Sequence, residues 1–279
     1  MVYLVAMGLV AVAAALAVAA GQPEISFWSG FAHAQVYLMA ADGSGVRRLT
    51  NLYSAKRGVW SPDAKRLAFD GRFYPTLFDF DIGIARPDGS RVRRVTRGPE
   101  RDIMAAWSPD GRWLAFSRLR AEGAEPGVWL VRPSGRQAHR LVRGTAPSWS
   151  PDGRWVAFDA AGGIWAVRPD GSRRHRILAG SAGGLKWSPD GRRIAYTSWR
   201  GNAPEIYVAR ADGSHPRRLT HNAVDDFDPS WSPDARKILY THGRENAHAV
   251  YVMNSDGTGK QRLTRGGDAW ATSWRPSRR

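Results

Sequence analysis

Short apolar stretches with alternating polar positions recur along this chain, and turns built from Pro, Asp, Gly and Ser separate them. The stretch RWLAF (112–116) is followed by GVWLV (127–131), and a basic segment such as RRLT (217–220) closes a comparable unit. A period of two over a few residues, bounded by tight turns, is typical of short antiparallel strands. The pattern therefore predicts an all-β chain of repeated four-stranded meanders.

A tryptophan introduces each repeating unit, and Ser-Pro-Asp-Gly follows it in most copies. The lead tryptophans stand between 38 and 47 residues apart at Trp60, Trp107, Trp149, Trp187, Trp231 and Trp274. A single four-stranded sheet cannot bury both of its faces, but sheets packed radially bury them against one another. Six units therefore predict a six-bladed β-propeller with four antiparallel strands in each blade.

The two ends of the repeat predict how the ring closes. Only five residues follow Trp274, so the last unit has its first strand and nothing more. The segments 24–30, 35–44 and 46–50 match the second, third and fourth strands of the other units. We expect one blade to combine a C-terminal strand with three N-terminal strands.

Residues 1–21 form an apolar segment without a charged side chain. It has the length of a signal peptide or of a short membrane anchor, and Ala17-Val18-Ala19 suits a signal peptidase. No basic residue precedes the apolar run. We expect a cleaved signal, with an uncleaved anchor as the alternative, followed by a single propeller domain over residues 22–279. The location is then extracytoplasmic, either periplasmic or secreted.

The charge of the chain is strongly basic, with 41 Lys and Arg against 25 Asp and Glu and a formal net charge of +16. The arginines are spread through the repeats rather than gathered in one tract, so we expect a solvated basic surface and no specific nucleic-acid site. Pairs such as Arg47-Arg48 and Arg217-Arg218 fall on the predicted outer strands, where charge protects an exposed edge. An anionic wall polymer or glycan is the alternative partner for this surface. The chain has no cysteine, which excludes disulfides and thiol chemistry.

The Trp-Ser-Pro-Asp-Gly motif is interpreted as scaffolding. Pro and Asp suit the central positions of a tight turn, and Gly suits the next position if φ is positive there. Ala64 and Ala235 replace this glycine in two copies, at a cost of about 1 kcal/mol if φ stays positive. We assign the six lead tryptophans and the turn aspartates Asp110, Asp152 and Asp190 this structural role.

The WSPDG-led repeat, with its DGS hairpin and RRLT ending, resembles the TolB-type propeller, also described as a WD-like β-propeller repeat. The resemblance covers residues 24–276 and is specific for the fold. It is less specific for function, because this repeat serves in several unrelated settings. Similar propellers precede the hydrolase domain of prolyl oligopeptidase-like peptidases, and TolB itself carries an N-terminal α/β domain. We expect neither additional domain here.

The topology of a meander predicts where a binding site lies. The uniform Pro-Asp-Gly and Asp-Gly-Ser turns fall on one face of the disc, and connections of irregular length and composition fall on the other. Binding residues are usually carried by variable loops on a rigid scaffold. The irregular face offers aromatic, basic and acidic side chains. The candidate binding residues are Tyr74, Arg101, Asp102, Arg120, Trp199, Arg200, Asn202, His221, Asp225, Asp226, Asp228, His242 and Arg244.

The sequence contains no G-x-S-x-G and no H-E-x-x-H motif. His221 with Asp225, Asp226 and Asp228 is the nearest approach to a metal or acid–base cluster, but solvated loop residues are the simpler interpretation. We therefore expect no catalytic residue, no metal and no cofactor.

The sequence predicts an exported, non-catalytic propeller that acts as a monomer and binds an envelope or secreted protein through its irregular face. The alternative is a carbohydrate-active propeller, a lyase or hydrolase with its site at the channel mouth. That alternative requires His221, His242, Arg200 and the acidic residues at 225–228 to converge from different blades.

Overall fold

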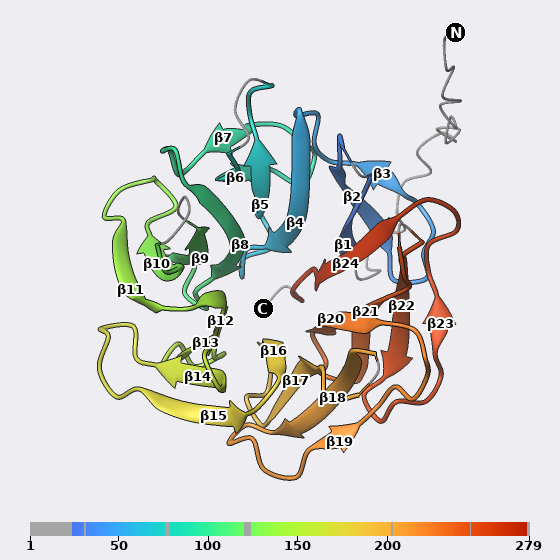
Figure 1. Ribbon diagram of the computed structural model, residues 1–279. Helices are drawn as coiled ribbons and strands as arrows, with labels where there is room; N and C mark the ends of the chain where they lie inside the picture. Colours follow the sequence, from blue (N-terminus) through green and yellow to red (C-terminus); the bar gives the residue numbers. More distant parts are fainter. Residues whose placement is uncertain are drawn as a thin grey trace, which may run out of the picture.

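The computed structural model describes residues 24–30, 32–75, 79–119, 124–201, 203–245 and 247–277. In this part of the chain the regular structure is entirely β: 24 strands form six four-stranded antiparallel sheets, arranged radially around a central channel (Figure 1). The all-β, six-bladed prediction is thus confirmed. The described residues include no helix long and apolar enough to cross a membrane. The predicted signal or anchor at 1–21 lies outside the described residues.

Each blade runs from an inner strand at the channel to a short outer strand at the rim. Blade one is β4 (Ser54–Trp60), β5 (Leu67–Arg72), β6 (Asp81–Ala85) and β7 (Arg93–Arg94). Blade two is β8 (Arg101–Trp107), β9 (Leu114–Leu119), β10 (Gly127–Val131) and β11 (His139–Arg143). Blade three is β12 (Thr145–Trp149), β13 (Val156–Ala160), β14 (Gly163–Val167) and β15 (His175–Ala179).

The remaining blades repeat this order. Blade four is β16 (Ala182–Trp187), β17 (Arg193–Ser198), β18 (Glu205–Arg210) and β19 (Arg217–Arg218). Blade five is β20 (Asp226–Trp231), β21 (Lys237–His242), β22 (Ala249–Asn254) and β23 (Gln261–Arg262). Blade six is β24 (Ala269–Trp274), β1 (Glu24–Ser29), β2 (Gln35–Ala40) and β3 (Arg47–Arg48).

Blade six closes the ring as the sequence predicts, because its strand order is β24-β1-β2-β3. Strand β24 pairs antiparallel with β1, and the register sets Trp28 opposite Trp270. Buried Glu24 receives hydrogen bonds from Arg47 at 3.1 Å and from Arg275 at 2.5 Å. Two arginines from opposite ends of the chain therefore share one carboxylate at the seam.

The Ser-Pro-Asp turns share one hydrogen-bond pattern. In the turn after β8, the Ser108 hydroxyl donates to Asp110 Oδ1 at 2.5 Å and accepts the Trp113 N–H at 2.9 Å. Asp110 Oδ1 also accepts the Arg112 N–H at 3.0 Å. Equivalent bonds recur around Ser61, Ser150, Ser188 and Ser232. In each of these turns the Ser and Asp side chains make their hydrogen bonds within the turn itself, as expected for a structural role.

The lead tryptophans lie between neighbouring blades. Trp107 Nε1 donates to the Val59 carbonyl of the preceding inner strand at 3.2 Å, and Trp231 and Trp274 repeat this contact with Lys186 and Ser230. Apolar side chains from adjacent sheets form the core around them; Ile82 of blade one and Leu114 of blade two, for example, share one cluster. The core is therefore a ring of interfaces between blades, which fixes the loops on each face.

The arginine pairs do more than protect an edge. The first arginine of a pair donates to a turn carbonyl of the next blade: Arg47 to Pro87 at 2.7 Å, Arg93 to Ser134 at 3.1 Å and Arg217 to Asp256 at 2.9 Å. The interpretation of these pairs as merely solvated charges is too simple. The corresponding basic pair of blade three, Arg173-Arg174, differs from the others because it precedes the outer strand β15 instead of lying on it.

Candidate binding face and channel mouth

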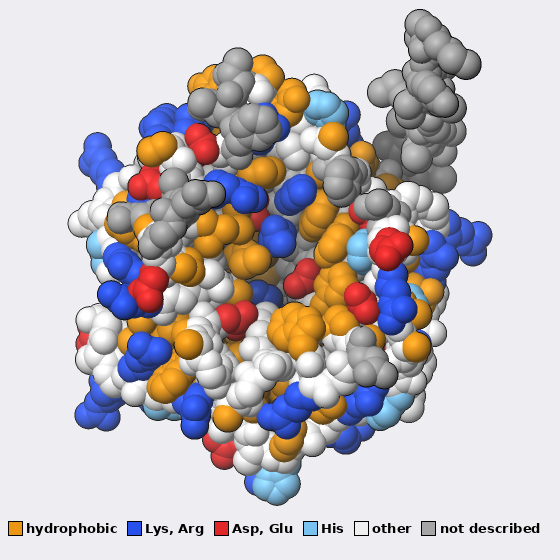
Figure 2. Space-filling model, in the orientation of Figure 1, with side chains coloured by type: hydrophobic (Ala, Val, Ile, Leu, Met, Phe, Trp, Pro, Cys, Tyr) orange, Lys and Arg blue, Asp and Glu red, His pale blue; other side chains and the backbone are white. Residues whose placement is uncertain are grey.

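The irregular connections gather on one face of the disc, where they are tied to one another. The connection between the second and third strands of a blade accepts a backbone hydrogen bond from the start of the next inner strand. Examples are Ala55 to the Ala34 carbonyl at 2.7 Å, Asp102 to Phe80 at 2.7 Å and Ala269 to His248 at 2.9 Å. Figure 2 shows apolar, basic and acidic side chains around the central hollow.

A bulge in the inner strand shapes the wall of the channel. Its residue has positive φ in several blades, at Arg57, Met104, Ala146, Gly184 and Asp228. A bulge of this kind re-aims the neighbouring side chains and leaves a backbone N–H outside the ladder.

A polar side chain from the second strand of the preceding blade accepts the freed N–H. Asp70 accepts the Met104 N–H, Ser117 that of Ala146 and Asp159 that of Gly184, each at 2.9 Å. Serine and aspartate therefore serve the same structural purpose, and an aspartate brings an additional charged oxygen close to the channel.

Aromatic side chains cluster at the mouth beside the seam. Trp28 stacks on Trp270 with centroids 5.0 Å apart and an interplanar angle of 12°. Phe227 lies 5.1 Å and His248 4.0 Å from the Trp270 ring, and Asp268 holds His248 Nδ1 at 2.7 Å. The seam therefore joins aromatic groups from β1, β20, β24 and the connection before β22. We call Trp28, Phe227, His248 and Trp270 the seam cluster.

Cations border the seam cluster. The Lys56 ammonium lies over the Trp28 ring, 4.7 Å from its centroid, and the Arg101 guanidinium lies 5.8 Å from the Phe80 ring. Burial, followed by the neighbouring Arg57 charge, lowers the pKa of Lys56. Arg57 Nη1 contacts Asp70 Oδ2 at 3.4 Å. Burial raises the pKa of Asp70 to about 6 in spite of that arginine. This part of the mouth combines aromatic faces with closely spaced cations.

The opposite wall of the channel carries a second charged group. Burial raises the pKa of Asp159 to about 6, and its Oδ1 is buried without a hydrogen-bond partner among the described residues. Burial lowers the pKa of Lys186, while Asp228 and Asp159 act against that shift. These three side chains form an electrostatically coupled set within the channel.

The candidate residues of blade five fall into two groups. Asp226 is fully buried and accepts hydrogen bonds from His242 Nδ1 at 2.6 Å and Asn222 Nδ2 at 2.7 Å. Burial raises the pKa of Asp226 above its usual value, although the hydrogen bond with His242 acts in the opposite direction. Arg244 lies 3.5 Å from Asp225. Asp228 belongs instead to the channel, and His221 is exposed on the connection before β20.

The other candidates differ sharply in exposure. Tyr74 is 53% and Trp199 50% exposed, and Arg101 is exposed at the start of β8. Arg200 donates to the Ala179 carbonyl at 3.0 Å. Asp102 is buried and makes a bidentate pair with Arg118, both contacts being 2.7 Å. Asp102 therefore has a structural role beneath the surface, and its carboxylate is not accessible to a partner.

Two candidates, Arg120 and Asn202, lie outside the described residues. Within the described ranges, no group of three or more His, Asp or Glu side chains is arranged to hold a metal ion. His221, Asp225, Asp226 and Asp228 are directed to different surroundings although they are close in sequence.

The seam cluster and its neighbour Lys56 were not among the residues predicted from the sequence. The predicted closure contained a usable signal, because pairing the first N-terminal strand with the C-terminal strand brings Trp28 close to Trp270. Lys56 carried no comparable signal, since its position over Trp28 depends on the contact between blades six and one.

The C-terminal part of the repeat is similar to a known family. Residues 171–278 match the family model described as TolB beta propeller domain. An uncharacterized protein of Agrobacterium fabrum is 33% identical over 115 residues, which are 40% of this chain and 36% of that protein. The Tol-Pal system protein TolB of Syntrophus aciditrophicus is 40% identical over 55 residues, 20% of this chain and 12% of that protein. The matches thus span about a third or less of these curated relatives.

The fold comparison agrees with the sequence matches. The crystal structure of TolB from Acinetobacter baumannii superposes with a TM-score of 0.79 at 18% identity, covering 91% of this chain and 67% of that chain. At this identity the likeness concerns the fold. The chain is therefore a six-bladed β-propeller whose repeat and fold are similar to those of the TolB propeller.

Proposed function

We propose that this propeller is an exported, non-catalytic scaffold that binds another protein at the cell envelope through the irregular face and channel mouth. The observation that carries the proposal is the set of exposed side chains Tyr74, Arg101 and Trp199 on that face, beside the largely buried seam cluster. Aromatic side chains and arginine are the groups most enriched at the energetic centres of protein interfaces. The exposed Tyr74, which lies beside Arg94 of the outer strand β7, and the exposed Trp199 spread this chemistry over the face.

The charge of the mouth indicates what a partner would present. Lys56 and Arg101 lie close to aromatic faces, and neither has a carboxylate oxygen within ion-pair distance among the described residues, although Asp70 and Asp268 act on the Lys56 charge from farther away. An acidic segment with an apolar side chain would therefore complement this part of the face. The uncharged apolar segment at 1–21 and the similarity to Tol-Pal system protein TolB support an extracytoplasmic location for the encounter.

The test compares two sets of alanine substitutions in the full chain. The face variant combines Tyr74→Ala, Arg101→Ala and Trp199→Ala. The control variant combines Val46→Ala, Val92→Ala and Arg112→Ala, which also removes two exposed large side chains and one arginine, from the uniform face. Unchanged circular dichroism and Tm establish that both variants are folded.

Each protein is then used to capture cross-linked partners from an envelope extract, which are quantified by mass spectrometry. We expect the face variant to lose at least tenfold of a specific partner and the control to retain it, since an interface anchor contributes about 2 kcal/mol or more. Equal capture by both variants would exclude the proposed face.

A further inference from the structure

Blade five carries an arginine that lacks the carboxylate partner found in blades one and four. In four blades the second residue of the outer strand is an arginine that donates Nε to the carbonyl of a threonine two positions later, at 2.6–3.1 Å. These arginines are Arg48, Arg94, Arg218 and Arg262. Their side chains are thereby held in one orientation, with the terminal nitrogens facing the first residues of the third strand.

In blades one and four the first residue of the third strand is a carboxylate that meets these terminal nitrogens, whereas in blade six Arg48 Nη2 donates to Asn51 Oδ1 at 2.9 Å. Arg94 pairs with Asp81 at 2.6 Å, and Arg218 pairs with Glu205. The equivalent position in blade five is Ala249, because Val250 donates to Thr264 just as Ile206 donates to Thr220. No acceptor among the described residues reaches the terminal nitrogens of Arg262.

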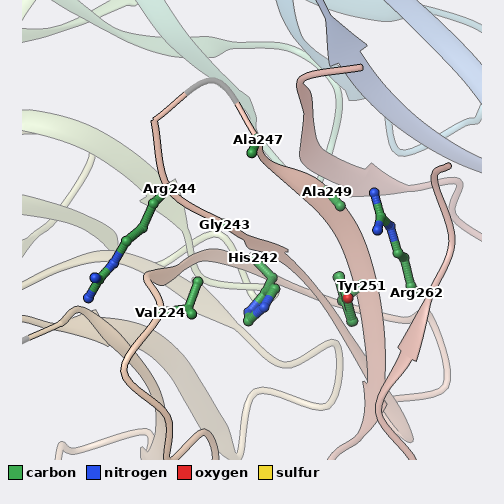
Figure 3. Close-up of a pocket in the computed structure, with 8 residues that line it drawn as sticks. All are labelled: Val224, His242, Gly243, Arg244, Ala247, Ala249, Tyr251 and Arg262. Atoms are coloured by element: carbon green, nitrogen blue, oxygen red, sulfur yellow. The ribbon is translucent and has the colours of Figure 1, made fainter. Parts of the chain in front are cut away.

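A pocket of about 360 Å³ occupies the place of the missing carboxylate. Figure 3 shows the Arg262 guanidinium beside Ala249, with the rings of Tyr251 and His242 on the same wall. The His242 and Tyr251 rings are 4.8 Å apart, and His242 Nδ1 is occupied by Asp226. The Arg244 guanidinium is turned away from Arg262, toward Asp225 and the Ala223 carbonyl.

We propose that this pocket of blade five is a binding site for a carboxylate. The ligand would take the position that Glu205 occupies in blade four and would accept hydrogen bonds from the terminal nitrogens of Arg262. Planar guanidinium groups bind carboxylates through two parallel hydrogen bonds. His242 Nε2 faces no partner among the described residues and offers a further polar contact. Ala249 and Val224 supply an apolar surface for the carbon attached to the carboxylate.

The site lies on the outer part of the irregular face, away from the inner strands at the channel. It is lined by Val224, the end of β21, the connection from β21 to β22, β22 and β23. Blade four serves as an internal reference, because there the chain supplies its own carboxylate. The variant Ala249→Glu would place a carboxylate of the chain itself beside Arg262, as Glu205 is placed beside Arg218, and would so block the site.

Binding is tested by NMR, following the backbone amides of residues 247–251 and 262 in the full chain. The probes are acetate and an N-acetyl, C-amidated glutamate, with the corresponding glutamine derivative as the uncharged reference at constant ionic strength. We expect saturable shifts with both carboxylates and none with the glutamine derivative. Equal affinities would identify a free carboxylate as sufficient, and tighter binding of the glutamate derivative would identify an acidic peptide as the preferred source.

Three variants decide the assignment. Ala249→Glu and Arg262→Gln are each expected to weaken carboxylate binding at least tenfold, whereas Arg236→Ala, which removes an exposed arginine from the uniform face, leaves it unchanged. Arg262→Gln keeps the test valid if Ala249→Glu does not fold. Linear, non-saturating shifts in the unmodified protein, or undiminished binding by Arg262→Gln, would overturn the proposal.

Discussion

Asp159 supplies a hydrogen-bond acceptor that the structure needs, but its buried negative charge lowers the stability of the folded protein. Its Oδ2 accepts the Gly184 N–H at 2.9 Å, while its Oδ1 is buried without a partner. At the preceding interface, between blades two and three, the hydroxyl of Ser117 accepts the equivalent N–H from Ala146. A neutral acceptor is therefore sufficient for the structural purpose, and the second oxygen of Asp159 adds a desolvated charge.

Asp159→Asn should stabilise the protein at neutral pH and have little effect in acid. The pKa of Asp159 is raised to about 6, so the folded state binds more protons than the unfolded state between pH 4 and 6. The contribution of Asp159 to stability therefore falls as pH rises through this window. We expect a gain of about 1–2 kcal/mol at pH 7.5 and almost none at pH 4.5, measured by urea unfolding.

Asp110→Asn is the matched control with the opposite sign. Partial burial raises the pKa of Asp110, but hydrogen bonds from Ser108 and the Arg112 N–H outweigh this effect and lower it overall. The stabilisation from Asp110 is present above its unfolded pKa and is lost in acid. Asp110→Asn should thus destabilise the protein at pH 7.5, and a gain in stability there would contradict this interpretation.

The two kinds of uniform turn differ in their tolerance of a methyl group. A Cβ at Gly111, in the Pro-Asp-Gly turn, would lie 3.9 Å from Pro62 Cδ, which is an ordinary contact. Ala64 and Ala235 occupy this position in two blades with φ of 54° and 58°, and both methyl groups are buried. Burial of the methyl group offsets part of the conformational cost predicted from sequence.

The Asp-Gly-Ser turn is more restrictive in most blades, because its glycine meets the backbone of the preceding blade, with Gly171 as an exception. A Cβ at Gly213 would lie 2.1 Å from the Ile177 carbonyl oxygen, whereas one at Gly171 would meet nothing within 4 Å. Their φ values are nearly equal, at 84° and 83°. We expect Gly171→Ala to cost about 1 kcal/mol and Gly213→Ala about 2–4 kcal/mol in chemical denaturation. Similar costs for the two would show that φ alone determines the effect.

Element types and their order could be read from the sequence because each blade repeats the same alternation and the same turns. The blade count, the outer-strand arginine pairs at 47–48, 93–94 and 217–218 and the mixed blade all follow from that repetition. For the candidate site, the sequence could predict only which face of the disc carries it. The residues that meet on that face are determined by contacts between blades, such as Lys56 over Trp28, and by bulges that re-aim side chains. Neither kind of contact produces a periodic pattern in the sequence.

The ring as a whole depends on the pairing of β24 with β1. A chain ending at Gly267 would leave β1 with an unpaired edge and would lose the buried Ala271 and Trp274. We expect its Tm to fall by more than about 10 °C, since loss of a buried tryptophan alone costs about 3–5 kcal/mol. Adding a peptide of residues 268–277 should restore part of the Tm through strand addition. An unchanged Tm in the shortened chain would show that closure contributes little.

The shared carboxylate at the seam also fixes the direction in which the protein can be tethered. Glu24 lies opposite Ala40 in the register of β1 and β2, and Ala40 leads directly into an Asp-Gly-Ser turn of the uniform face. Arg275 N donates to the Glu24 carbonyl at 2.8 Å, so the chain enters and leaves the ring at the same point of that face. An attachment made before residue 24 would hold the disc by its uniform side. The seam cluster and the carboxylate pocket would then look outward from the anchoring surface, open to partners arriving from solution.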